Sequence, residues 1–258
     1  GRMEQEMGNG AYTYLEAGDL KIDRRIHHKG HIEFPTQHFH GVTIAFDMKE
    51  ATKNLPLEMR DFPVDLYALQ KKYCDSKHPF VIPGEPAIEH IFSELYSIPL
   101  NIKKYYLKVK IFELLLYLDA LELAGTKEER PYFYKTQVEK IKAIRSLMTE
   151  NLTEHYTLDD LAKRFDIPHT TMKSCFKSIY GNSIFAYMRE YRMNYAANLL
   201  REQNDLSIAQ IAGMVGYDSP GKFSSAFKAV MGSTPLSYRK FPVHAVNLWP
   251  GGEDETSK

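Results

Sequence analysis

Leu158-Asp159-Asp160-Leu161-Ala162, followed by Phe176-Lys177 and Gly181, recurs about fifty residues later as Ile208-Ala209-Gln210-Ile211-Ala212, followed by Phe227-Lys228 and Gly232. From the last alanine of each run to the glycine there are 19 positions in the first copy and 20 in the second, so one residue is inserted in a turn. Two copies of this pattern predict two helix-turn-helix units, and hence two recognition helices, on one chain.

Local signals place the helices of these units. Ser207 followed by Gln210 fits a capping box, and Thr157 followed by Asp160 is a weaker version of it. Ser219 is a good cap directly before Pro220, a residue favoured in a first helical turn. The hydrophobic periodicity predicts further helices over about 138–151, 168–180 and 184–203.

Length and composition limit the class of protein. The 258 residues suggest about two domains, and contents of 43% hydrophobic and 26% charged residues are ordinary for a soluble globular protein. No apolar run reaches the roughly 18 residues of a membrane span, and the first thirty residues lack the apolar core of a signal peptide. Cys74 and Cys175 are too far apart in sequence to indicate a zinc cluster or a disulfide framework. We therefore expect a cytoplasmic protein with reduced cysteines and no membrane association.

The formal net charge is zero but is unevenly distributed. Residues 131–242 contain 15 Lys and Arg against 10 Asp and Glu, whereas residues 1–130 contain 17 against 20. A basic C-terminal half beside a mildly acidic N-terminal half fits a nucleic-acid binder joined to another domain, although ordinary domains also reach an excess of this size.

The N-terminal half has a different pattern, with strands first and helices after. Runs rich in β-branched and aromatic residues predict short strands at 12–15, 20–22 and 41–46. Helices are predicted within 56–74, over 85–96 and over 99–124. The apolar stripe of the last helix is wide enough to pack on its own domain and on something else.

These segments define a predicted α+β organisation. Residues 1–124 form a sensing and dimerisation domain, 125–134 a polar linker bounded by Gly and Pro, and 135–242 an all-α domain with two helix-turn-helix units. The tail, residues 243–258, is predicted to be disordered.

The C-terminal half resembles the AraC/XylS family of bacterial transcription regulators. Besides the two repeated runs, the resemblance rests on positions spread over about 135–240: Tyr187, Arg192, Ala196, Leu199-Leu200, Val215-Gly216-Tyr217, Phe223, Thr234-Pro235 and Tyr238-Arg239. It implies a seven-helix domain that binds double-stranded DNA, joined to an N-terminal domain, often a small cupin-like barrel with helices, that binds a small-molecule effector and dimerises. RNA polymerase would be a further partner if the protein is an activator. We expect Arg192, Tyr238 and Arg239 to hold the domain together.

The DNA contacts are predicted from the polar faces of the two recognition helices. Residues at the start of such a helix reach base edges, so Thr170, Lys173 and Ser174 are predicted to contact bases. His169 and Lys177 are predicted to contact phosphates. In the second copy Lys222 and Ser225 are the base candidates, and a phosphate is expected near Gly221, with Lys228 flanking this face. The alternative is that these polar residues form a solvated face.

The sensing domain offers only weak site candidates. His38 and His40 lie two apart on one predicted strand face, within a cluster that also holds His27, His28 and His31. Cupin metal sites use this spacing, but they also need a glutamate a few residues on, where this chain has Thr43 and Ile44. We therefore predict no metal and no cofactor. Tyr12, Tyr14, His31, His38 and His40 remain candidates for lining a ligand pocket, although most such residues are core or surface groups.

Two other functions were weighed against a ligand-controlled, non-enzymatic regulator. A metal-binding cupin-type enzyme with a DNA-binding appendage would require the missing carboxylate, and the sequence has no recognisable nucleophile–base pair or phosphate loop. A DNA-repair fusion of the alkyl-acceptor type would require a cysteine zinc cluster, which two distant cysteines cannot supply.

Overall fold

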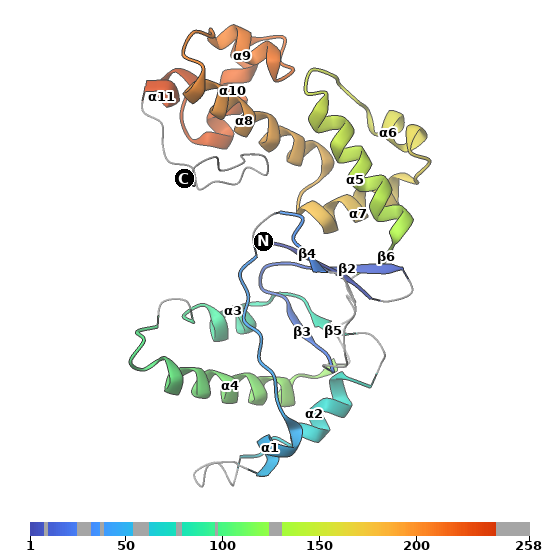
Figure 1. Ribbon diagram of the computed structural model, residues 1–258, viewed down its shortest axis with the longest axis vertical. Coiled ribbons are helices and arrows are strands. Elements are labelled where there is room, and N and C mark those ends of the chain that lie inside the picture. The colour runs from blue at the N-terminus through green and yellow to red at the C-terminus, as the bar shows by residue number, and fades with distance from the viewer. Residues whose placement is uncertain are drawn as a thin grey trace, which may run out of the picture. The chain divides into compact units, whose positions relative to one another are not determined.

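The computed structural model in Figure 1 describes residues 1–7, 10–24, 32–36, 39–53, 62–75, 79–95, 98–123 and 131–240. The chain divides into two compact units, the first made of residues 1–34 and 38–132 and the second of residues 35–37 and those from Phe133 on. Most of the expected linker and the whole expected tail lie outside the described residues, so the domain limits stay a prediction.

The first unit combines short strands with helices, as an α+β fold requires. Its elements are β1 (Met3–Glu6), β2 (Ala11–Leu15), β3 (Leu20–Ile22), β4 (Ile32–Glu33), α1 (Met48–Lys53), α2 (Leu66–Tyr73), β5 (Phe80–Ile82), α3 (Pro86–Phe92) and α4 (Lys103–Ala120). β1 pairs antiparallel with β2 and with β4, and β3 pairs antiparallel with β5. The cupin-like character of this unit remains a prediction.

Helices α2, α3 and α4 carry the core of the first unit. Its buried side chains include Tyr73, Ile82, Ile88, Ile91, Leu114 and Leu118. The Tyr73 hydroxyl donates to the Leu118 carbonyl at 2.6 Å, and Lys72 Nζ donates to the Leu118 and Asp119 carbonyls. Side chains of α2 therefore supply hydrogen bonds to carbonyl groups at the C-terminal end of α4, which have no partner within that helix. Burial, assisted by the Asp119 charge, raises the pKa of Tyr73 to about 12. None of the helices in the described ranges could cross a membrane.

Several expectations for this unit need correction. Residues 41–46 form no strand, and the side chains of Phe39, Val42 and Phe46 are exposed. A β-rich run forms a strand only where a neighbouring strand can pair with it, and no described strand pairs with this one. The polar run of β1 was not predicted. The last helix is shorter than 99–124, because α4 begins only at Lys103 and ends at Ala120.

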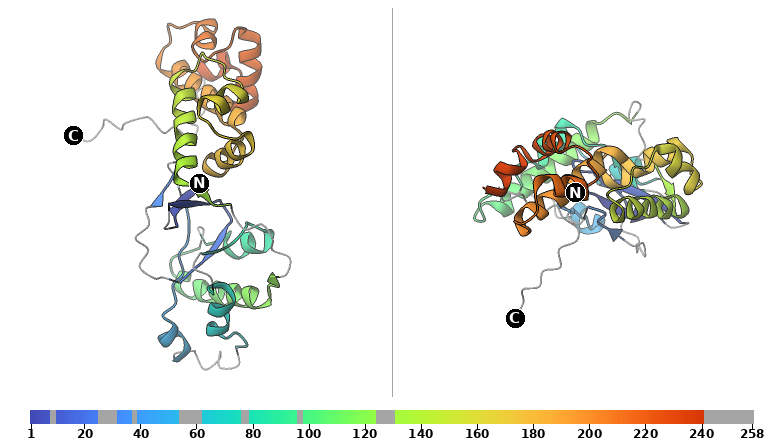
Figure 2. Two further views of the ribbon diagram at one scale, coloured as in Figure 1. Left: turned by 90° about the vertical axis from the view of Figure 1, so that its right-hand side faces the viewer. Right: turned by 90° about the horizontal axis from the view of Figure 1, so that it is seen from above.

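The second unit is almost entirely helical (Figure 1, Figure 2), as predicted. Its elements are β6 (Phe133–Tyr134), α5 (Lys135–Glu150), α6 (Leu158–Arg164), α7 (His169–Tyr180), α8 (Ile184–Glu202), α9 (Ile208–Met214), α10 (Pro220–Met231) and α11 (Pro235–Lys240). Both capping boxes form, since Thr157 and Asp160, and likewise Ser207 and Gln210, exchange side-chain-to-backbone hydrogen bonds. Ser219 caps α10, which begins at Pro220.

Candidate nucleic-acid interface

The first helix-turn-helix consists of α6 and α7. Met172, Cys175, Phe176 and Ile179 are fully buried, as their spacing predicted, and they fix which face of α7 points inward. The turn before α7 is closed by the Ile167 amide, which donates to the Ala162 carbonyl at 3.1 Å. The opposite face of α7 is therefore the one available to a partner.

That outer face carries the predicted contact residues of the first copy. Thr170, Lys173, Ser174 and Lys177 are exposed, at positions that follow one another along one side of the helix. Ser174 Oγ donates to the Thr171 carbonyl at 3.2 Å, so its hydroxyl is directed to its own helix. His169 differs from the others because it is half-buried and its Nε2 lies 3.0 Å from Asp159 Oδ1. Asp159 was not predicted as part of this surface.

The second helix-turn-helix, α9 and α10, has the same arrangement. Phe223 and Phe227 are fully buried, whereas Ala226 and Val230 are only partly buried against the same core. The predicted contact residues Gly221, Lys222, Ser225 and Lys228 are all exposed on α10. Ser225 Oγ donates to the Gly221 carbonyl at 3.1 Å, which repeats the behaviour of Ser174.

The repeat extends further than the sequence comparison indicated. Phe176 packs edge-to-face on Tyr187 with ring centroids 5.5 Å apart, and Phe227 packs in the same way on Tyr238 at 5.4 Å. In both copies the tyrosine follows the phenylalanine by eleven positions. This common spacing was the signal that could have revealed the contact from the sequence.

Helix α8 and the loop before α6 join the two copies. Arg192 of α8 donates from Nη2 to the Glu154 carbonyl at 3.1 Å, and burial lowers the pKa of its guanidinium. Arg239 donates in a similar way to the Leu206 carbonyl at 2.7 Å, and Tyr238 is buried. Each of these residues makes contacts within the domain, in agreement with a structural role.

Gly216, in the turn of the second copy, approaches this loop closely. Its φ is +78°, and a Cβ built there would lie 2.4 Å from the carbonyl oxygen of Leu152. Only glycine meets both conditions, because other residues are strained at positive φ and would collide with the backbone. The contact holds the loop that precedes the first copy against the turn of the second.

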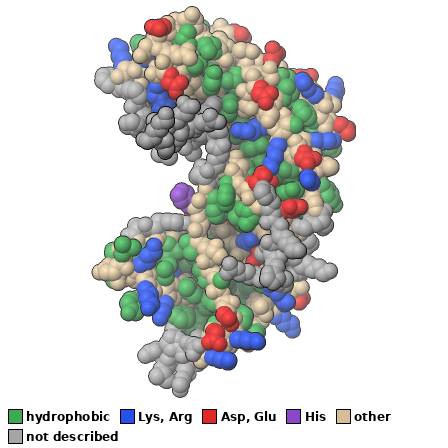
Figure 3. All heavy atoms as spheres, in the orientation of Figure 1, with side chains coloured by type: hydrophobic (Ala, Val, Ile, Leu, Met, Phe, Trp, Pro, Cys, Tyr) green, Lys and Arg blue, Asp and Glu red, His purple; other side chains and the backbone are tan. Residues whose placement is uncertain are grey.

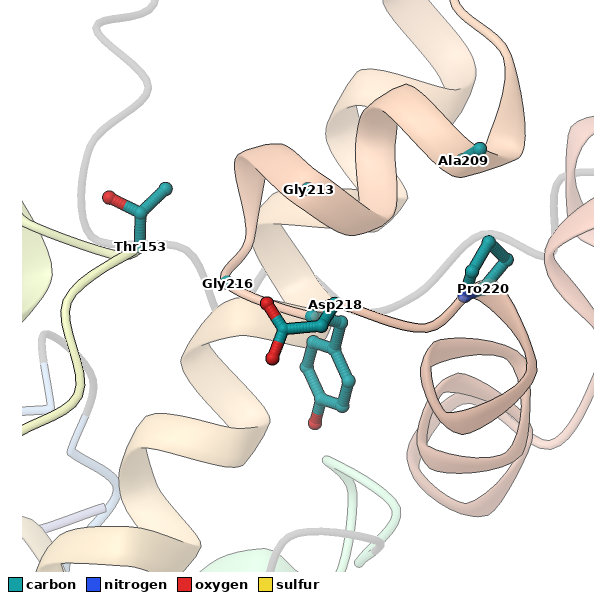
Figure 4. Close-up of a pocket in the computed structure, with 7 residues that line it drawn as sticks. Thr153, Ala209, Gly213, Gly216, Asp218 and Pro220 are labelled. Atoms are coloured by element: carbon teal, nitrogen blue, oxygen red, sulfur yellow. The ribbon is translucent and has the colours of Figure 1, made fainter.

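The two copies differ where the first turn of one helix faces the start of the next. The repeat aligns Asp159 with Ala209 and, after the inserted residue, His169 with Pro220. Ala209 and Pro220 line a cavity of about 350 Å³ together with Thr153, Gly213, Gly216, Tyr217 and Asp218, as Figure 4 shows. The corresponding positions of the first copy are bridged by the Asp159–His169 pair instead.

Of the candidate ligand residues of the first unit, the structure describes Tyr12, Tyr14 and His40. Tyr14 is buried on β2 and donates from its hydroxyl to Glu4 Oε2 at 2.7 Å, Tyr12 is half-buried on the same strand, and His40 is exposed. His31 and His38 lie outside the described residues. Where the structure describes the chain, no group of three His, Cys, Asp or Glu side chains is placed to hold a metal ion. A cavity of about 210 Å³ lies elsewhere in the unit, lined by Ala51, Thr52, Phe62, Val64, Asp65, Leu66, Phe112 and Leu115.

Comparison with known proteins identifies the second unit. Residues 161–240 match the family described as helix-turn-helix domain. The chain is 39% identical over 87 residues to an AraC-like transcription regulator of Streptomyces lividans, which covers 34% of this chain and 28% of that protein. It is 26% identical over 146 residues to the HTH-type transcriptional activator RhaR of Mannheimia succiniciproducens, covering 57% and 51%. A similar solved structure is the C-terminal domain of AraT, a response regulator from Geobacillus stearothermophilus, with 28% identity, a TM-score of 0.37, and coverage of 42% of this chain and 94% of that one.

The expected resemblance is thus confirmed, and residues 161–240 are a helix-turn-helix domain of the AraC type. The chain spans about half, or less, of the length of the two curated relatives named above.

We predict that Gly216→Ala destabilises the second unit by more than Gly232→Ala does. Both glycines have positive φ, +78° and +77°, but a Cβ at Gly232 meets nothing within 4 Å. Gly232→Ala should therefore cost only the backbone strain, about 1 kcal/mol, whereas Gly216→Ala should add the displacement of the Leu152 carbonyl. Denaturant unfolding of the two variants measures the difference. Equal free energies of unfolding would show that the contact with Leu152 is not maintained.

Proposed function

We propose that this protein is a sequence-specific DNA-binding transcription regulator. Its second unit would bind double-stranded DNA through α7 and α10, and its first unit would form a homodimer and bind a small effector. The observation that carries the proposal is the pair of recognition helices, each with a fully buried aromatic face and an exposed polar face, on one AraC-type domain.

The charges of the two polar faces suit a DNA backbone. Lys173 and Lys177 are exposed on α7, and Lys222 and Lys228 are exposed on α10. Lysine at these positions can pair with guanine acceptors or with phosphates. Two such helices on one domain would enter major-groove segments about 34 Å apart, one turn of the duplex. Because the two helices carry different side chains, each copy of the chain is predicted to recognise an asymmetric DNA site.

Selection from a random-sequence duplex library tests this proposal. We expect enrichment of one asymmetric site with two short specified segments, bound with an affinity that falls steeply as salt rises, because each phosphate contact releases counterions. If no sequence is enriched and the affinity for DNA does not change with salt concentration, DNA recognition by this domain is contradicted.

The first unit offers a chemical class for the effector. Phe62, Val64, Leu66, Phe112 and Leu115 give the 210 Å³ cavity a mainly apolar lining, and Phe62 and Phe112 meet edge-to-face at 5.1 Å. Asp65 is engaged as the cap of α2, where its carboxylate accepts from the Tyr67 and Ala68 amides. These features favour a small, largely apolar effector. Such a ligand would regulate the protein only through different affinities for two states of the chain.

Helix α4 supports the proposal of a homodimer. Ile102, Tyr105, Val109 and Leu116 are 46%, 67%, 64% and 44% exposed. At 100° per residue they fall on one stripe, opposite the buried Leu114 and Leu118. Figure 3 shows hydrophobic side chains beside Lys and Arg side chains on the surface over this part of the first unit. An apolar stripe of this kind is typical of a helix that packs on a partner.

The charges that flank the stripe favour an antiparallel pairing of two copies. Lys108 and Asp119 are exposed on the same side of it. If Val109 packs on Leu116 of the second copy, Lys108 comes to face Asp119 of the second copy at both ends. A parallel pairing would instead place these residues of the two copies on opposite sides of the contact, where they could not pair.

We predict that Lys173→Ala changes the preferred base at one position of the selected site. Loss of a side chain that pairs with a base edge costs about 1–3 kcal/mol of discrimination at that position. Lys177→Ala is the matched control on the same helix, because a phosphate contact should weaken binding to all sequences alike and reduce the salt slope by about one. Selection with each variant provides the measurement. An unchanged preferred sequence for Lys173→Ala would contradict its assignment to base recognition.

We also predict that Val109→Glu shifts the protein from dimer to monomer. A glutamate in the middle of the stripe would place two like charges at the apolar contact, which opposes association. Tyr67→Glu is the control, since Tyr67 is 49% exposed on α2 and is not part of the stripe. Sedimentation of the parent chain and both variants at several concentrations distinguishes the cases. A Val109→Glu protein that dimerises like the parent chain would exclude this face.

A further inference from the structure

Asp159 and His169 form a side-chain pair at the predicted DNA-binding surface of the first copy. Asp159 lies in the first turn of α6, and His169 is the first residue of α7. Asp159 Oδ1 lies 3.0 Å from His169 Nε2, and the two side chains are 73% and 42% exposed. The pair therefore connects the two helices of the unit at the point where α7 begins, within reach of a partner molecule.

The neighbouring carboxylate, Asp160, has a different task. Its Oδ2 accepts hydrogen bonds from the Thr157 hydroxyl at 2.6 Å and the Thr157 amide at 2.9 Å, and these bonds lower the pKa of Asp160. Asp160 is thus committed to the helix cap. Asp159 is the carboxylate of this turn that is paired with His169.

The second copy provides an internal comparison. Its equivalent residues are Ala209 and Pro220, which have no charge and leave an open cavity between the helices. The capping box and the buried phenylalanine are common to both copies. The fold of the unit therefore does not need the Asp159–His169 pair, which points to a role at the surface.

We propose that Asp159 is a positioning residue that makes the contact of His169 with the DNA backbone depend on a proton. This proposal rests on the proposed function. With Nε2–H donated to Asp159, Nδ1 is the nitrogen left for a phosphate. In the neutral imidazole Nδ1 carries a lone pair and cannot donate to a phosphate oxygen. In the imidazolium Nδ1–H can donate, and the positive charge also offsets the repulsion between Asp159 and the phosphates.

Other charged groups lie on the elements that carry or pack against the pair. Lys163 lies on α6 and Lys173 one turn further along α7. In the turn between these helices, Asp166 is held by Lys140 of α5, whose Nζ lies 2.5 Å from its carbonyl and 3.6 Å from its Oδ2. On α8, Glu190 accepts from Asn182 at the far end of α7, and Arg189 is its neighbour in sequence. Among the side chains of proteins, imidazole is the one whose ordinary charge change falls between about pH 5 and 8.

The test is the pH dependence of DNA affinity at constant ionic strength, measured with a duplex of about 30 base pairs, long enough for two groove segments, selected by the parent chain. We predict that binding becomes tighter as the pH falls from 8 to 6, by up to about fivefold, the effect of one partly exposed charge contact. His169→Gln should abolish this change by lowering affinity at pH 6. Asp159→Asn should raise affinity at pH 8, because a carboxylate that repels the phosphates is removed, and should reduce the gain at pH 6, because Nδ1 is no longer held towards the phosphate.

Lys222→Ala in the second copy is the control, since it should weaken binding by the same factor at each pH and leave the pH dependence unchanged. The ¹⁵N shifts of the His169 ring give an independent readout, which a purely structural role would not change: at pH 6 both ring nitrogens should carry a proton, and the Nδ1 shift should move when the duplex is added. His169→Asn serves as a second variant if His169→Gln does not fold.

The outcomes separate the two proposals. A pH dependence that persists in His169→Gln, or one that is absent from the parent chain while it binds its duplex, overturns the role of the pair and leaves DNA recognition intact. No selected duplex, and no binding at either pH, overturns the proposed function itself.

Discussion

The edge-to-face packing of Phe176 on Tyr187, repeated by Phe227 on Tyr238, is the contact on which the second unit depends. Each pair joins a recognition helix to the helix that follows it. Buried aromatic pairs contribute both apolar area and a preferred orientation. Because the phenylalanine face of α7 or α10 is buried, the lysines on the opposite face of the same helix point to the solvent. The packing of the core thus determines which side chains the two recognition helices present to DNA.

The same core must also hold the two recognition helices at a fixed separation, because a duplex presents successive major-groove segments at a fixed interval. Helix α8 spans the two copies, and its Arg192 ties back to the loop before α6. Gly216 lets that loop approach the second turn more closely than any side chain would allow. These contacts act on the backbone rather than on the reading side chains. They would influence affinity through the spacing of the helices.

The sequence predicted those features of the structure that depend on contacts between residues close together in the chain. The caps at Thr157, Ser207 and Ser219, and the buried set around Phe176, follow from short-range spacing and were predicted correctly. The strand predicted at residues 41–46 failed because pairing is decided by a distant neighbour that the run itself does not specify.

The Asp159–His169 pair escaped prediction for a related reason. The two residues are ten positions apart on different helices, and their contact depends on the angle of the turn between α6 and α7. The repeat contained the clue, since the second copy has Ala209 and Pro220 at these positions. A search for aligned positions at which the two helix-turn-helix copies differ would have indicated this pair. A search for positions that the two copies share would have found the common spacing between phenylalanine and tyrosine.

Base-interference mapping on the selected duplex tests the central claim, that one chain uses both recognition helices, most directly. The account predicts two clusters of interfering bases in the major groove, on one face of the duplex and about 34 Å apart. Interference confined to a single cluster would contradict it, because it would mean that only one of the two helices recognises DNA.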